Sequence, residues 1–109
     1  MKLSCLQENL NKALEIVGGL TRSKSILPIT GFILVEAEVG CLKLTSTNLE
    51  TTFIVRIPAE TTSSGSLAVP AKLLIDFIDP LPVDKLEISS TDKSMSLKCG
   101  TYKARISGR

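Results

Sequence analysis

Residue types that could carry out chemistry are few in this chain of 109 residues. Histidine is absent, which excludes Ser-His-Asp triads, Cys-His dyads and histidine zinc sites. The cysteines are Cys5, Cys41 and Cys99, an odd number at wide spacing with no C-x-x-C motif. Cys5 alternates in phase with Leu3, as Cys99 does with Leu97, which predicts that both are core residues. We therefore expect free thiols and an intracellular, cytoplasmic chain.

Carboxylates at close spacing are the remaining candidates for catalysis or metal binding. Asp76 and Asp79 lie three residues apart, and Glu36 and Glu38 alternate along one apolar segment. Paired acids can hold Mg²⁺ or serve as general acid and base, but no further polar residue converges with either pair. A hydrolase using Ser or Asp would also need a base or nucleophile motif, which is missing. The sequence therefore predicts no catalytic residue, no metal and no cofactor.

Composition and charge narrow the class of protein further. Apolar residues make up 43% of the chain, enough for one compact core and incompatible with disorder. No apolar run approaches 18 residues and no charged-then-apolar leader is present, so we expect neither a membrane span nor a secretion signal. Thirteen basic against eleven acidic residues give a net charge of +2, too mild to indicate nucleic-acid binding by itself.

The elements that must position these residues follow from apolar periodicity. The pattern predicts strands at 1–6, 29–38, 42–45, 51–57, 66–69, 86–89, 94–99 and 102–107, and a polar loop at 58–65. It also predicts a helix from residue 7 that is ended by Gly18-Gly19, and a short helix that has Pro70 at its first position and is ended by Asp79-Pro80. Each half of the chain therefore reads strand, helix, strand, strand, strand. This order predicts an α+β fold of two four-stranded antiparallel sheets backed by two helices.

Five stretches in order along the chain resemble a known family. They are the opening Met-Lys-Leu with its helix, SILPI at 25–29, LKLTSTNLE at 42–50, VPAK at 69–72, and the closing segment from residue 100 to 107. Together they are similar to the first domain of the bacterial DNA polymerase III β subunit, the sliding clamp. Any one motif is weak, but five in register cover essentially the whole chain.

The resemblance implies a DNA clamp fold and a function without chemistry. Clamp polypeptides carry three such domains, and two chains close head to tail into a homodimeric ring around duplex DNA. The ring tethers the polymerase to its template, so its DNA contacts go to phosphates and are independent of sequence. Residues 1–109 would be the N-terminal domain, and the later domains, which bind DNA polymerase III and the clamp loader, would be absent from this chain.

The resemblance also assigns roles to particular residues. Lys24 and Lys72 match positions at which the family has basic DNA-contacting residues. Ala104 and Ile106 match positions that pack across the subunit junction, and the strands at 51–57 and 102–107 match those that meet neighbouring domains. Without the resemblance, the lysines would read as ordinary solvated side chains. The alternative function is a small β-rich protein-interaction module unrelated to replication, which a stop codon just after residue 109 would favour.

Overall fold

The computed structural model describes residues 1–22, 31–47 and 51–109. Within these residues the elements are β1 (Lys2–Leu6), α1 (Gln7–Arg22), β2 (Phe32–Glu38), β3 (Cys41–Thr47), β4 (Thr52–Pro58), β5 (Glu60–Ser63), β6 (Gly65–Pro70), α2 (Ala71–Ile78), β7 (Lys85–Thr91), β8 (Ser94–Cys99) and β9 (Tyr102–Ser107). Along β1, β3 and β8 buried residues alternate with more exposed ones, as expected for sheets with one buried face. The predicted α+β class is confirmed.

The strands form two antiparallel sheets, and the first strand of each half of the chain lies in the sheet formed by the other half. The five-stranded sheet has the order β5-β1-β7-β8-β9, and the four-stranded sheet has the order β4-β3-β2-β6. β1, which opens the first half of the chain, therefore pairs with strands of the second half, while β6 pairs with β2 of the first half. This exchange joins the two halves into one unit, and β4 and β9 each lie at the edge of a sheet.

The sequence prediction was wrong at β5 and at the end of α1. The segment expected to be a polar loop at 58–65 contains β5, which pairs with β1 and gives one sheet a fifth strand. A row of threonines and serines forms this edge strand because hydrogen bonding to a neighbour outweighs its lack of an apolar face. Helix α1 also passes through Gly18 and Gly19 and ends at Arg22. Glycine weakens a helix by only about 1 kcal/mol relative to alanine, so it need not end one.

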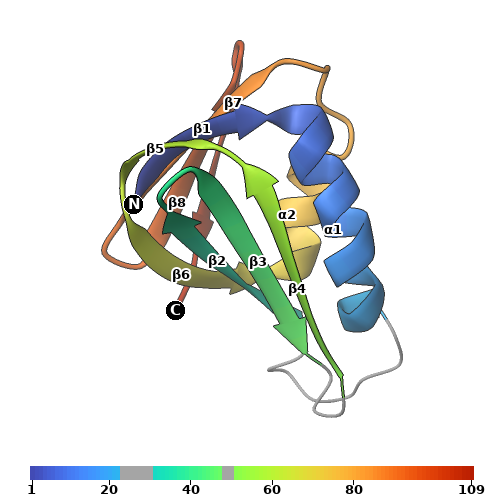
Figure 1. Ribbon diagram of the computed structural model, residues 1–109. Helices are drawn as coiled ribbons and strands as arrows, with labels where there is room; N and C mark the ends of the chain where they lie inside the picture. The colour runs from blue at the N-terminus through green and yellow to red at the C-terminus, as the bar shows by residue number, and fades with distance from the viewer. Residues whose placement is uncertain (23–30, 48–50) are drawn as a thin grey trace.

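The two helices lie together on one side of the molecule (Figure 1). On α1 the buried stripe consists of Leu10, Ala13, Leu14 and Val17, at the three- and four-residue steps of a helix face. On α2 the buried residues are Ala71, Leu74, Ile75 and Ile78. α1 packs mainly over β4 and β3, α2 contacts β6 and β9, and the helices also contact each other. Burial of each large side chain on these faces contributes roughly 1.5–3 kcal/mol to the stability of the fold. The opposite faces of the helices are open to solvent or ligands.

Buried hydrogen bonds fix the helices in this position. The side-chain amide of Gln7, at the start of α1, donates to the carbonyl of Ile78 at the end of α2 over 2.8 Å. The hydroxyl of Ser46 on β3 donates to the carbonyl of Val17 over 2.8 Å. Both side chains are only 2% exposed, so loss of either bond would leave a buried polar group unpaired.

The segment after β9 closes the seam between the two sheets. Arg109 and Ala68 on β6 exchange two backbone hydrogen bonds, of 2.8 and 3.2 Å. Gly108 makes this approach possible, because a Cβ atom there would lie 2.5 Å from the Ala68 carbonyl oxygen. The Arg109 guanidinium lies over the Phe32 ring, 4.7 Å from its centroid.

Candidate nucleic-acid interface

Lys72 lies in the first turn of α2 and points away from the core. Pro70 precedes the helix with φ −59° and ψ 124°, so it lies at the N-cap and not, as expected, at the first helical position. The Lys72 side chain is 86% exposed, and its Nζ atom lies 3.0 Å from Oδ2 of Asp76, which is 59% exposed. An exposed ion pair of this kind contributes between zero and about 1 kcal/mol. A phosphate could therefore replace Asp76 as the partner of Lys72.

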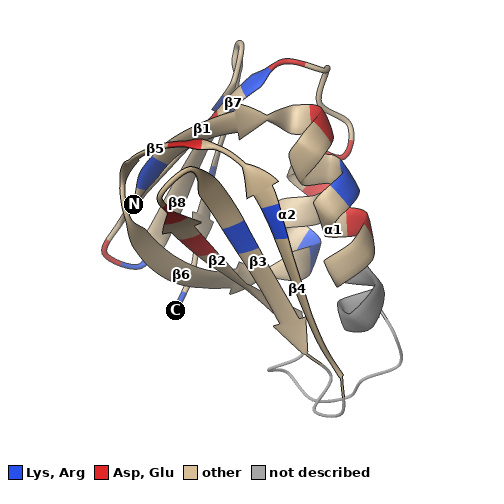
Figure 2. Ribbon diagram, in the orientation of Figure 1, with Lys and Arg blue, Asp and Glu red and all other residues tan. Residues whose placement is uncertain are grey.

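The helix layer carries charges of both signs (Figure 2). Its exposed residues with described side chains include the cations Lys12 and Lys72 and the carboxylates Glu8, Glu15, Asp76 and Asp79. Over this part of the layer the acids outnumber the bases by four to two. The described part of the helix layer therefore offers individual lysines and no broad positive field.

Lys24, the other lysine expected to contact DNA, lies outside the described residues. Its expected contact with DNA therefore stays a prediction. The ion pair between Lys72 and Asp76 was not predicted from the sequence, in which Asp76 was considered only as half of a carboxylate pair. The signal was present, because residues four apart on a helix are neighbours.

Ala104 and Ile106, the residues expected at a subunit junction, share one face of the edge strand β9. Ile106 is 5% exposed and belongs to the core of this domain. Ala104 is half-buried, and Tyr102, the next residue along the same face, is 55% exposed. The exposed part of this strand face is therefore at Ala104 and Tyr102, whereas Ile106 supports it from inside.

The thiols and the other acids do not assemble into a reactive centre among the described residues. Burial raises the pKa of the Cys5 thiol to about 12, and burial followed by the nearby Asp84 carboxylate raises that of Cys99. The pKa of Cys41 is also raised, by desolvation first and then by its hydrogen bond to Glu38. Glu36 and Glu38 lie in ion pairs with Lys43 and Arg56.

Within the part of the chain that the structure describes, no cluster of three or more cysteine, aspartate or glutamate side chains could hold a metal ion. No helix in the same ranges is long and apolar enough to cross a bilayer.

Comparison with known proteins identifies the family of this arrangement. The family described as the DNA polymerase III beta subunit, N-terminal domain, matches residues 1–108. The chain belongs to this family. Among the relatives is the beta sliding clamp of Synechococcus elongatus, 33% identical over 96% of the chain. The beta sliding clamp of Pseudomonas aeruginosa is 30% identical over 98% of it.

Solved structures agree with this membership of the beta-subunit family. The chain superimposes over its whole length on the DNA polymerase III subunit beta of Pseudomonas aeruginosa, with a TM-score of 0.90 and 28% identity. The pol III beta of Caulobacter crescentus gives a TM-score of 0.92 at 25% identity, again over all of the chain. The chain spans 29–30% of the length of these relatives.

Proposed function

We propose that this chain is the first domain of a sliding clamp that encircles duplex DNA and confers processivity on DNA polymerase III during chromosomal replication. The observation that carries the proposal is the match to the beta-subunit family over residues 1–108. In this proposal the full polypeptide forms a homodimeric ring in the cytoplasm. DNA polymerase III and the clamp loader bind parts of the polypeptide beyond this chain, and the domain itself is not catalytic.

The layered architecture supports an encircling role. Both helices lie on one side, so that side can line a hole while the sheets form an outer wall (Figure 1). β4 and β9 lie at sheet edges, where backbone groups can pair with strands of neighbouring domains. On β9, Ala104 and the exposed ring of Tyr102 would contact the neighbour, with Ile106 packed beneath them. The alternative, a protein-interaction module unrelated to replication, is not favoured by the family membership.

The mixed charge of the helix layer supports a clamp that stays on DNA because it encircles the duplex and not because it binds it tightly. With four carboxylates beside two described lysines, the isolated domain should bind duplex weakly. A closed ring does not need strong contacts, because it holds the polymerase near the template as an intramolecular partner. Lys72 and Lys24 would then make single-point phosphate contacts that permit sliding.

The decisive experiment uses the full polypeptide that contains this chain, loaded onto a nicked circular plasmid by its clamp loader. Encirclement predicts that the protein stays on the circle through gel filtration and leaves once the plasmid is cut at one site. Equal retention on circular and linear DNA would contradict the proposal, because binding would then depend on contacts alone.

The phosphate contacts are tested separately in the same polypeptide. Lys24→Glu with Lys72→Glu should weaken equilibrium binding of duplex and reduce the slope of log K against log salt by roughly 2, about 0.9 for each lost contact. Lys93→Glu, an exposed lysine in the turn between β7 and β8, is the matched control. Asp76→Asn frees Lys72 and should tighten binding about twofold. An unchanged slope in the double variant would exclude direct phosphate contact.

A further inference from the structure

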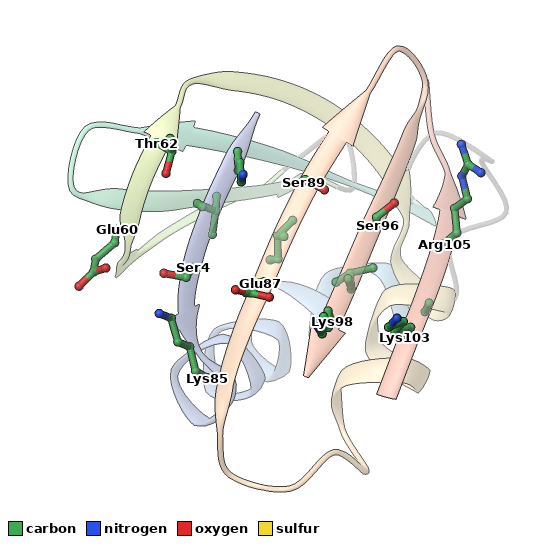
Figure 3. A pocket seen from close by; sticks show the side chains of 15 residues that line it. Ser4, Glu60, Thr62, Lys85, Glu87, Ser89, Ser96, Lys98, Lys103 and Arg105 are labelled. Carbon is green, nitrogen blue, oxygen red and sulfur yellow. The ribbon is translucent and has the colours of Figure 1, made fainter. Parts of the chain in front are cut away.

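The outer face of the five-stranded sheet, opposite the helices, is hollowed. A shallow depression of about 840 Å³ runs across all five of its strands (Figure 3). Side chains alternate along each strand, so the polar and charged residues that line it point away from the core, whereas the buried Leu3, Ile88 and Leu97 face inward beneath the floor of the hollow. This surface therefore has no part in the proposed contacts of the helix side with DNA.

The charges in the hollow are predominantly positive and unevenly placed. Five cations and two carboxylates line it. Lys98 on β8 lies directly opposite Lys103 on β9, and Arg105 lies opposite Ser96. We call Lys98, Lys103 and Arg105 the β8–β9 cation cluster. Figure 3 shows Lys98 and Lys103 side by side on β8 and β9, Arg105 farther along β9, Glu87 on the neighbouring strand β7, and Glu60 at the far edge of the sheet.

The β8–β9 cation cluster has no carboxylate partner among the described residues. The ion pairs within the described ranges involve Lys43, Arg56 and Lys72. Glu87 stands opposite Lys98 in the register of β7 and β8, yet the two form no ion pair. Like charges directly opposite each other destabilise a sheet, so stability alone gives no reason for this arrangement.

Hydroxyl groups extend the polar floor of the hollow away from the cluster. Ser89 and Ser96 face each other between β7 and β8, in a cross-strand row that runs from Lys2 on β1 to Arg105 on β9. The backbone groups of the inner strands are already used in the sheet. The hydroxyls of Ser89 and Ser96, which we call the serine row, are therefore neutral hydrogen-bonding groups that a bound molecule would meet, together with those of Ser4 and Thr62 toward the other edge.

We propose that this hollow binds a short acidic peptide segment of a partner protein, with its carboxylates on the β8–β9 cation cluster and its peptide groups on the serine row. The charge of the cluster is complementary to two or three carboxylates close together. The volume of about 840 Å³ is comparable to that of small-ligand sites, and the open, shallow shape leaves room for an extended segment to enter and leave at its edges.

The same features disfavour nucleic acid as the occupant. Neighbouring strands are about 4.8 Å apart, so three cations on two strands span too short a distance to follow a phosphate backbone. Among the described residues no aromatic side chain lines the hollow, and single-stranded DNA would need one for base stacking. A shallow hollow in a sheet cannot admit the wide, convex surface of duplex DNA.

The test is titration of this 109-residue chain with a fluorescein-labelled peptide of about twelve residues that carries clustered Asp and Glu among Ser and Gly. We expect saturable, salt-sensitive binding and backbone amide shifts centred on β8 and β9 in NMR spectra. Lys98→Glu with Lys103→Glu should weaken binding about tenfold or more, and Lys93→Glu, outside the hollow, should leave it unchanged.

A charge swap keeps the test independent of folding defects. The Lys98→Glu/Lys103→Glu variant, checked by circular dichroism, should bind a Lys-rich version of the peptide better than the unmodified chain does. Absence of binding by the acidic peptide, or equal binding of its Asn/Gln version, would overturn the proposal. So would displacement of the peptide by duplex DNA or by oligo-dT at lower concentration than the unlabelled peptide requires. None of these outcomes depends on whether the full polypeptide encircles DNA.

Discussion

The outer faces of the two sheets use their charges differently. On the four-stranded sheet, Lys43 lies 3.7 Å from Glu36, and Arg56 lies 3.4 Å from Glu38. Each of these cations therefore has its own carboxylate, although Lys43 and Arg56 are themselves opposite each other. On the five-stranded sheet, Lys98 and Lys103 are also opposite each other, but neither has an ion-pair partner within the described residues.

Lys43 and Arg56 are therefore neutralised by carboxylates of their own sheet, whereas among the described residues Lys98 and Lys103 are not. The four-stranded face satisfies its cations internally, and the row beside them is largely apolar, with Leu34 and Ile54 on either side of Thr45. The five-stranded face leaves like charges together over a hollow. Lys98 and Lys103 repel each other across β8 and β9 without a compensating ion pair in the described part of the chain, so binding of a ligand explains these cations better than stability of the fold does.

The largest expected effect concerns the reactivity of the thiols, because the two sheets bury Cys5 and Cys41 to different extents. Cys5 lies on the inner face of the five-stranded sheet with a pKa near 12, whereas Cys41 begins a strand of the four-stranded sheet and is half-exposed. Moving a thiol pKa from 9.0 to about 12 lowers its thiolate fraction near neutral pH roughly a thousandfold. Alkylation followed by mass spectrometry should label Cys41 first and Cys5 only after unfolding.

The same burial predicts a pH dependence of stability. The folded state holds the Cys5 proton up to a pKa of about 12, against 9.0 for an exposed thiol, so between these values the unfolded state binds fewer protons. The contribution of this group is complete below pH 9 and is lost as the pH rises toward 12. Cys5→Ala should remove this part of the alkaline loss. Labelling of Cys5 as fast as Cys41 in the folded chain would contradict both expectations.

The second prediction tests the seam that joins the two sheets. Gly108→Ala should lower the free energy of unfolding by about 2 kcal/mol, because its Cβ would meet the Ala68 carbonyl at 2.5 Å and Leu67 Cγ at 2.7 Å. Gly31→Ala is the matched control, since a Cβ there meets nothing within 4 Å. Urea unfolding measures both. If the two variants were equally stable, the Arg109–Ala68 contact would not hold the sheets together.

Much of this architecture could be predicted from the sequence, because alternation and helical periodicity are local signals. The bounds of β8 and β9 agree with the predicted strands, and Cys5 and Cys99 are buried as expected. β5 could not be predicted, since its threonines and serines form a strand only because β1 offers an edge. The exchange of first strands likewise depends on long-range pairing that no local pattern encodes.

The candidate sites show the same division between local and long-range information. Lys72 was selected by the family resemblance, and the structure places it on the exposed side of α2. Its partner Asp76 could have been recognised only from the i,i+4 spacing of the two residues. The β8–β9 cation cluster was within reach of sequence reasoning. A two-residue turn at Gly100-Thr101 places Lys98 opposite Lys103. The hollow around the cluster requires the neighbouring strands and could not be predicted.

The third prediction concerns the apolar row of the four-stranded face. The Thr45 hydroxyl oxygen is buried without a hydrogen-bond partner. Thr45→Val should therefore raise the free energy of unfolding by about 1 kcal/mol. Thr47→Val, two residues along the same strand, is the control with the opposite sign, because the Thr47 hydroxyl donates to the Thr51 carbonyl over 3.2 Å. Thermal unfolding of both variants should show shifts of opposite direction; a loss of stability in Thr45→Val would mean that its hydroxyl is satisfied in solution.

The smallest effect gives the sharpest contrast between the two outer faces. Lys103→Glu places a carboxylate opposite Lys98 and should stabilise the chain by about 0.5 kcal/mol. Glu36→Lys breaks the pair with Lys43 and places two lysines opposite each other, so it should destabilise the chain by a similar amount, about 0.5 kcal/mol. Urea unfolding at low salt should resolve the two signs, and the difference should shrink near 1 M salt, where the Debye length is about 3 Å. If Lys103→Glu instead lowered stability, the like charges of the β8–β9 cation cluster would not be in conflict in the unbound chain. If Lys103→Glu raised stability and also weakened binding of the acidic peptide, the like charges would lower the stability of the fold while serving binding, as expected of a binding surface.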